Sequence, residues 1–186
     1  MRYLFAAIAI ACAAVAQAQD GAAYYGLQLG AFNYEEEAGP GFSGLKDSPT
    51  SWRAMIGYQF SDHLGVEGGW GKTGGINDTA TLSGLGTLNY HSEFSSILIV
   101  RLLGVLPLDN FRLMGGLGWA DMKQKESFSI NTGPTQSVKS SGGEATYFAG
   151  AQYDWERFAL RLGYEKFDFG GDVNVDETSI TFWYKL

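Results

Sequence analysis

The sequence predicts an all-β protein, an up-and-down barrel of eight antiparallel strands. Eight segments alternate between apolar and polar residues, and the connections between them alternate between short and long. No segment keeps the period of an amphipathic helix, and no apolar run after residue 18 is long enough to span a membrane as a helix. Strands are therefore the elements that remain.

The first 18 residues are expected to be a signal peptide. Arg2 precedes an apolar run from Leu4 to Ala16, and Ala16-Gln17-Ala18 matches a cleavage site. Cys12, the only cysteine, raises a lipoprotein alternative. Cleavage leaves residues 19–186 as a single barrel domain with 12 basic and 20 acidic residues. That excess of acid argues against nucleic-acid binding, which depends on Lys and Arg.

The alternating segments can be placed in order along the chain. They are AYYGLQLGAF (23–32), WRAMIGYQF (52–60), LGVEGGWGK (64–72), EFSSILIVRLLGVL (93–106), FRLMGGLGWA (111–120), ATYFAGAQYDW (145–155), ALRLGYEKF (159–167) and TSITFWYKL (178–186). In the seventh, Leu160, Leu162 and Tyr164 share one face, and Arg161 and Glu165 share the other.

The fourth segment has a less regular pattern. Placing Arg101 on the polar face puts Glu93 there too, and puts Phe94 on the apolar face with Leu98, Val100 and Leu102. Ile97 and Ile99 then fall on the polar face, where apolar side chains are not expected.

The connections predict which end of each strand lies outside. Short connections fall at 61–63, 107–110 and near 156, and long ones at 35–50, 73–91, 124–143 and 170–176. Outer-membrane barrels combine tight periplasmic turns with larger external loops. The long connections are therefore expected outside, with both termini periplasmic.

The apolar face is expected to meet lipid, because the strand-end aromatics lie on it as interfacial girdles do. The predicted interfacial aromatics are Tyr25, Trp52, Tyr58, Phe60, Trp70, Trp119, Tyr164 and Tyr184. The alternative is a soluble sandwich or lipocalin-like barrel, with the apolar face inside.

The polar face is expected to fill the lumen with paired charges, because an isolated buried charge is very costly. The predicted lumen network consists of Arg53, Glu67, Glu93, Arg101, Arg112, Arg161, Glu165 and Lys185. Glu67 is favoured over Glu165 as the partner of Arg161, since Glu165 lies four residues away along the same strand. An eight-stranded barrel is only wide enough for side chains, which favours a plug over a narrow porin-like channel.

Catalysis and metal binding have weak support. His91, Ser92 and Glu93 suggest a lipid A hydrolase, but adjacent strand residues point to opposite faces. Glu35–Glu37 and Asp172–Glu177 are interpreted as solvated acidic loop tips. No catalytic residue, cofactor or metal is therefore expected. Loop lysines (Lys46, Lys72, Lys123, Lys125, Lys139) could meet lipopolysaccharide phosphates, and the loops could serve an adhesin.

The motifs resemble the OmpA-like transmembrane β-barrel family of Gram-negative outer membranes. The resemblance rests on Gly57-Tyr58-Gln59-Phe60, the strand from Leu64 to Trp70, the luminal Arg161 and the final ITFWYKL. It implies a monomer in the cell outer membrane with a structural role in envelope integrity. Its implied partners are membrane lipid, lipopolysaccharide and the barrel-assembly machinery. The chain departs from the family by ending in Leu186 and by having no peptidoglycan-binding domain after the barrel.

Overall fold

The computed structural model describes residues 21–36, 45–82, 86–131, 133–169 and 173–186, and these residues form one antiparallel sheet that closes on itself. The predicted signal peptide at 1–18 lies outside the described residues, as does Glu37. The strands are β1 (Ala22–Glu36), β2 (Leu45–Asp47), β3 (Thr50–Ser61), β4 (Leu64–Thr73), β5 (Gly75–Leu82), β6 (Gly86–Leu108), β7 (Phe111–Ile130), β8 (Gln136–Trp155), β9 (Phe158–Asp168) and β10 (Val173–Lys185). Within the described ranges there is no helix long and apolar enough to cross a membrane.

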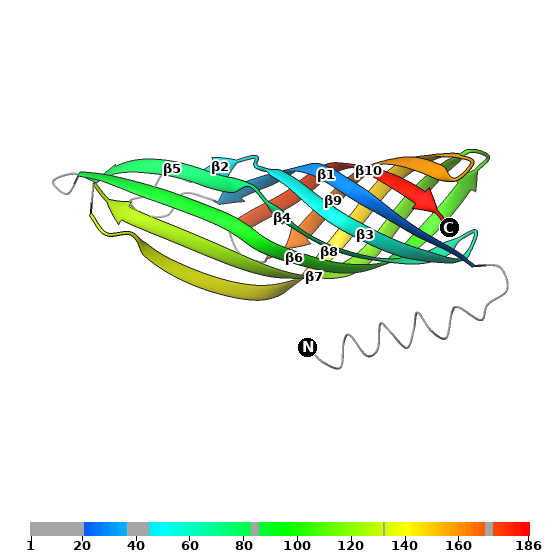
Figure 1. Cartoon of the computed structure of the whole chain (residues 1–186), viewed down its shortest axis with the longest axis horizontal. Coiled ribbons are helices and arrows are strands. Elements are labelled where there is room, and N and C mark those ends of the chain that lie inside the picture. Colours follow the sequence, from blue (N-terminus) through cyan, green and yellow to red (C-terminus); the bar gives the residue numbers. More distant parts are fainter. Residues whose placement is uncertain (1–20, 37–44, 83–85, 132, 170–172) are drawn as a thin grey trace.

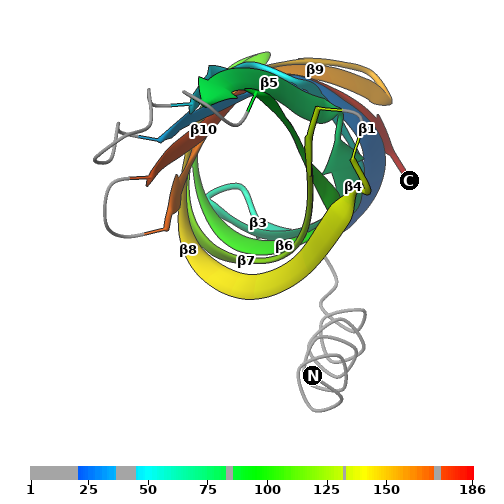
Figure 2. The same cartoon turned by 90° about the vertical axis from the view of Figure 1, so that its left-hand side faces the viewer.

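The ten strands occupy eight positions around the ring, each of which we call a stave, and this confirms the predicted fold class. β2 and β3 both pair with β1, and β4 and β5 both pair with β6, so each couple is one interrupted stave. The interruptions fall at Ser48-Pro49 and at Gly74. Pairing of β10 with β1 closes the ring, seen end-on in Figure 2. Closure leaves the staves without a free edge around the barrel body.

Short turns gather at one end of the barrel. They lie at Asp62-His63, Asp109-Asn110 and Glu156-Arg157, with both ends of the described chain beside them at the right of Figure 1. Asp109 and Glu156 have φ angles of 55° and 47°. We call this the turn end, and the opposite end the loop end.

Much of the predicted long connections is strand. β5 and the start of β6 occupy most of 73–91, and β7 and β8 extend through most of 124–143. β6, β7 and β8 contain 23, 20 and 20 residues, whereas β9 and β10 contain 11 and 13. We call the extension formed by residues 75–82, 86–94, 123–130 and 136–144 the projecting sheet; it reaches beyond β9, β10 and β1 at the left of Figure 1.

Side-chain polarity is inverted relative to a water-soluble protein. Along β9, buried and exposed residues alternate without a break: Arg161 and Glu165 are 1% exposed, while Leu162 is 59% exposed. Ile56 and Leu117 on other staves are 67% and 66% exposed. Charges face in and aliphatic side chains face out, as lipid on the outside requires.

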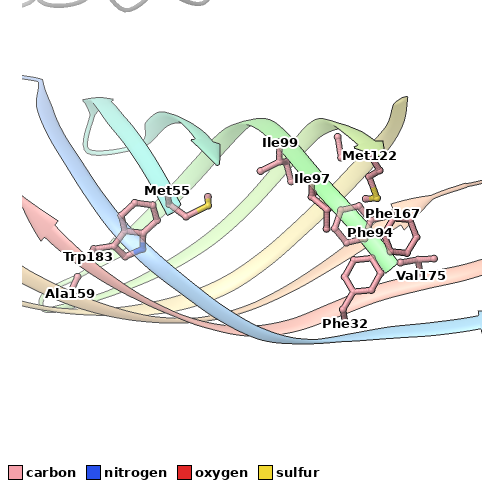
Figure 3. Close-up of a cluster of buried hydrophobic side chains, with 11 residues drawn as sticks. Phe32, Met55, Phe94, Ile97, Ile99, Met122, Ala159, Phe167, Val175 and Trp183 are labelled. Atoms are coloured by element: carbon pink, nitrogen blue, oxygen red, sulfur yellow. The ribbon is translucent and has the colours of Figure 1, made fainter. Parts of the chain in front are cut away.

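Apolar side chains also fill part of the interior, in two groups visible in Figure 3. At the loop end, Phe32 packs between Phe94 and Phe167, with ring centroids 5.2 and 5.5 Å away. Trp183 and Met55 belong to the second group, nearer the turn end. The charged residues described next lie in the interior together with these groups.

Candidate functional site

The lumen contains a chain of alternating charges centred on Glu67. Its carboxylate accepts hydrogen bonds from Arg101 Nε at 2.9 Å and Nη2 at 2.7 Å, and pairs with Arg161 Nη1 at 2.7 Å. The Tyr24 hydroxyl donates a further bond at 3.0 Å. The expected pair of Arg161 with Glu67 is therefore present, and Glu67 is shared with a second arginine.

The chain continues across the lumen through two more carboxylates. Glu165 accepts from Arg101 Nη1 at 3.3 Å and from Arg53 Nη1 at 2.9 Å. Arg53 also pairs with Glu177, which accepts from Gln28 Nε2 at 3.1 Å. The order Glu177–Arg53–Glu165–Arg101–Glu67–Arg161 joins three carboxylates to three guanidinium groups, each 1% exposed or less. The set is neutral, so every charge has a buried partner of opposite sign.

Glycines opposite the arginines create the room for these long side chains. Gly71 is the cross-strand partner of Arg53, and an added Cβ there would come within 2.7 Å of Arg53 Cγ. Gly118 faces Arg101, and its added Cβ would come within 2.9 Å of Arg101 Cβ. The inward glycines and the arginines thus form one packing arrangement across neighbouring strands.

Aromatic rings cover the guanidinium groups. Arg101 Cζ lies 3.9 Å from the centroid of Phe148, and Arg161 Cζ lies 4.8 Å from Trp183. Arg53 Cζ lies 5.6 Å from Phe167, which belongs to the loop-end apolar group. Such contacts stabilise buried cations beyond their ion pairs.

A second polar group closes the turn end of the lumen. Asp154 pairs with Lys185 Nζ at 2.9 Å and also with Arg112, which donates to Gln59. A cavity of about 60 Å³ lies between this group and Arg161. Arg112 and Lys185 are partly exposed, and Gln152 links their group to the central chain, because it donates to Asp154 Oδ1 at 2.8 Å and accepts from Arg161 Nε at 2.9 Å.

Glu93 does not belong to the lumen network, and its predicted position is wrong. The register of β6 shifts between Phe94 and Ser96, so one extra residue changes the face of everything before it. Phe94 therefore points inward and is 1% exposed, and Glu93 points outward, where it lies 4.0 Å from Lys125. Ile97 and Ile99 come after the shift and share the inward face of Arg101, where the sequence placed them, and both are 0% exposed.

Sequence reasoning also missed members of the lumen groups. Glu177 was assigned to an acidic loop tip, yet it is 0% exposed within β10. The signal was available, because Glu177 continues the inward alternation of Ser179 and Thr181. Asp154 is two residues beyond the inward Gln152 and could have been found in the same way.

The predicted interfacial aromatics lie on the outer face of the ring. Tyr25, Trp70, Trp119 and Tyr164 are each about half exposed, at 51, 52, 53 and 46%. The side chains of Trp52, Tyr58, Phe60 and Tyr184 are partly covered by neighbours. Trp52 packs edge-on against Trp70, with ring centroids 5.6 Å apart.

The residues considered for hydrolysis are not assembled. Ser92 is buried on the inner face of β6, whereas the neighbouring His91 faces out and contacts Asn77 Oδ1 through Nδ1 at 2.8 Å. His63 lies in a turn at the opposite end of the barrel, 3.2 Å from the Val105 carbonyl oxygen. A nucleophile and its base must share a site, and these do not.

Comparisons with known proteins were made for the whole chain. The family model described as outer membrane protein β-barrel domain matches residues 3–185. No curated protein sequence shows significant similarity.

Three solved structures illustrate the fold similarity. Ail, the attachment invasion locus protein of Yersinia pestis, is 20% identical with a TM-score of 0.59, covering 89% of this chain and 97% of its own. Neisserial surface protein A is 12% identical with a TM-score of 0.61, covering 90% and 100%. The N-terminal β-barrel domain of Pseudomonas aeruginosa OprF is 14% identical with a TM-score of 0.52, covering 87% and 97%. At these identities the similarity concerns the fold.

Proposed function

The chain belongs to the outer membrane protein β-barrel domain family, and we propose that it is a closed, non-conducting barrel that serves a structural role in the outer membrane. In this proposal the turn end and both termini are periplasmic and the loop end faces outward. The lumen is a plug rather than a path for ions.

The observation that carries the proposal is the unbroken chain from Glu177 to Arg161. Fixed charges within 3.3 Å of one another occupy the cross-section of a ring that is only eight staves wide. An ion crossing this layer would have to separate pairs whose members are otherwise buried and uncompensated, which is costly.

The loop-end apolar group adds a second barrier. Phe32 packs against Phe94 and Phe167 with tilted rings inside the barrel, and Phe167 lies 5.6 Å from Arg53 Cζ. Hydrophobic constrictions stop ions by excluding water. A polar plug and an apolar plug in series favour a structural role over the porin-like alternative.

A non-catalytic role follows from the same geometry. His91 and Ser92 lie on opposite faces of β6, and the buried carboxylates are all engaged by arginines. We therefore propose no reaction and no cofactor for this chain.

Conductance tests the proposal directly. The folded protein would be inserted in planar lipid bilayers, with a water-filled porin as a positive control for insertion and detection. We expect no discrete current steps from this protein at potentials at which the porin conducts. Reproducible steps that scale with protein concentration would overturn the closed-barrel proposal in favour of a channel.

A second candidate, a surface-binding protein, is favoured by the projecting sheet. β6, β7 and β8 continue beyond the rim formed by β9 and β10, so they display backbone and side chains above the barrel. Deleting residues 125–139 removes the outer part of the β7–β8 hairpin together with the β7 partners of Leu88–Glu93 in β6. Binding of the parent barrel to host cells or matrix that is lost on this deletion would support the second candidate; absence of binding by the parent would reject it.

A further inference from the structure

We propose that Lys123, Lys125 and Lys139 form a binding site for the phosphate groups of membrane lipids at the loop end of the barrel. This inference rests on the proposed function, because it requires the barrel to stand in a bilayer with the projecting sheet above one leaflet. It assigns a specific surface of the chain to lipid headgroups.

The three lysines lie on one face of two paired strands. Lys125 of β7 is the direct cross-strand partner of Lys139 of β8, and Lys123 is paired with Ser141 on the same face. The inward face of the same strands is defined by the buried Met122, so the lysines point outward. Like charges directly opposite each other destabilise a strand pair, and an anion bound between them would remove that penalty.

The surrounding carboxylates do not neutralise this cluster. Glu93 reaches Lys125, with Oε1 to Nζ at 4.0 Å. Within the ranges that the structure describes, no carboxylate comes within ion-pair distance of Lys123 or Lys139. The chain as a whole has a net charge of −7, so the cluster is a local reversal of charge.

The cluster borders a groove that suits a headgroup. Ser95, Lys123, Lys125, Lys139 and Ser141 line a groove of about 420 Å³. Ammonium and hydroxyl donors are the groups that bind phosphate oxygens. The extra residue at Ser95, where β6 changes register, forms one wall of this groove.

Position relative to the aromatic belt identifies lipid as the source of the phosphate. Trp119, half exposed on the same face of β7, precedes Lys123 by four residues and Lys125 by six. These offsets are about 13 and 20 Å along the strand, and strand tilt reduces them to about 10 and 15 Å along the barrel axis. Interfacial Trp marks the headgroup level, and lysine stems reach back toward it.

The lipid-facing surface lies on the same two strands, and Asp121 separates Trp119 from Lys123 on the outward face of β7. Leu117, Trp119 and Tyr147 are outward on these strands, nearer the turn end than the lysines. A lipid whose acyl chains lie along these residues presents its headgroup at Lys123. A soluble polyanion would use the charges alone and would gain nothing from these apolar residues.

The test measures lipid retention in detergent micelles containing either phosphatidic acid or phosphatidylcholine. We expect the parent to retain phosphatidic acid at least tenfold more strongly than phosphatidylcholine, and the preference to weaken with salt. Combined Lys123→Gln, Lys125→Gln and Lys139→Gln changes should abolish the preference. Lys166→Gln, which removes an outward lysine of β9 that does not line the groove, should leave it unchanged.

Two results would overturn the proposal. One is a triple variant that folds and keeps the full preference. The other is dextran sulfate or inorganic phosphate binding to the parent in phosphatidylcholine micelles as tightly as phosphatidic acid does, which would make the cluster a site for soluble anions.

Folding and function can be separated in this test. Heat-modifiable gel migration establishes that each variant is folded. Should the triple variant not fold, Lys139→Gln alone relieves the Lys125–Lys139 repulsion and should fold while binding phosphatidic acid several-fold more weakly. The micelle assay is independent of conductance: current steps with intact lipid preference would reject the closed barrel alone, and a silent barrel without lipid preference would reject the site alone.

Discussion

Replacing Glu67 by Met should destabilise the barrel more than replacing Arg161 by Met. Glu67 is the shared acceptor of Arg101, Arg161 and Tyr24. Its loss leaves Arg161, which is 1% exposed, with only Gln152 as a polar partner, and weakens the compensation of Arg101. Removing one member of a buried pair in this way costs about 3–5 kcal/mol.

Arg161→Met is expected to be milder because Glu67 keeps two partners. Arg101 and Tyr24 still donate to its carboxylate, at 2.7 and 3.0 Å for their shortest contacts. The loss is then that of charged hydrogen bonds, about 1.5–3 kcal/mol. In the double variant Arg101 retains Glu165 and its stacking on Phe148, so the two changes together should cost about 1–3 kcal/mol less than their sum.

The assay is urea unfolding in lipid vesicles, monitored by tryptophan fluorescence and arranged as a double-mutant cycle. Lys166 provides a matched control, since it lies on β9 like Arg161 but faces outward. Lys166→Met combined with Glu67→Met should be additive within about 0.5 kcal/mol. Absence of coupling between Glu67 and Arg161, or a larger cost for Arg161→Met than for Glu67→Met, would refute the reasoning.

Three further predictions concern the outer face, a packed glycine and a turn. Leu162→Arg, at a site 59% exposed on the outer face, should cost about 2–4 kcal/mol in the same vesicle assay, and equal stability would mean that this face is not in lipid. Gly71→Ala should prevent recovery of the heat-modifiable form, because its Cβ would lie 1.8 Å from the Trp52 carbonyl oxygen, whereas Gly104→Ala, with nothing nearer than 3.8 Å, should fold normally. Glu156→Gly should raise the free energy of unfolding by about 0.5–1 kcal/mol, because the φ of 47° at this position disfavours side chains; a decrease would contradict that turn geometry.

The alternation in the sequence was sufficient to assign the inward and outward faces where the barrel wall is regular. In β9, every second residue from Ala159 to Phe167 is buried, so the faces of Leu162 and Arg161 followed from the pattern alone. The partner of Arg161 was predicted correctly too, although β4, which carries Glu67, lies four strands from β9 on the opposite side of the ring. Two-residue periodicity and the rule of apolar outside, polar inside carried these predictions.

The rule of apolar residues outside and polar residues inside failed where the strands extend beyond the lipid-facing part of the barrel. In the projecting sheet the inward face carries Phe128 and Ile130 while the outward face carries Ser127 and Ser129, so the polarity is the reverse of the barrel wall. The sequence pattern was therefore interpreted as loop. The register shift beside Ser95 leaves no signal in the sequence. An extra residue in a strand changes which face the preceding residues take, but it does not change their composition.

Spin labels at single cysteines would test the central account most directly, because Cys12, the only cysteine of the sequence, lies within the predicted signal peptide. Labelled cysteines would replace Leu162 of β9 and Ile180 of β10 on the outer face. In separate variants they would replace Ser179 and Thr181 of β10 on the inner face. Accessibility to oxygen, which enters lipid, and to a water-soluble nickel complex would be measured in vesicles. The account predicts oxygen access at the two outer sites and access to neither reagent at the two inner sites. Nickel access at Ser179 and Thr181 would contradict a closed lumen, and oxygen access there with none at Leu162 and Ile180 would contradict the inverted barrel itself.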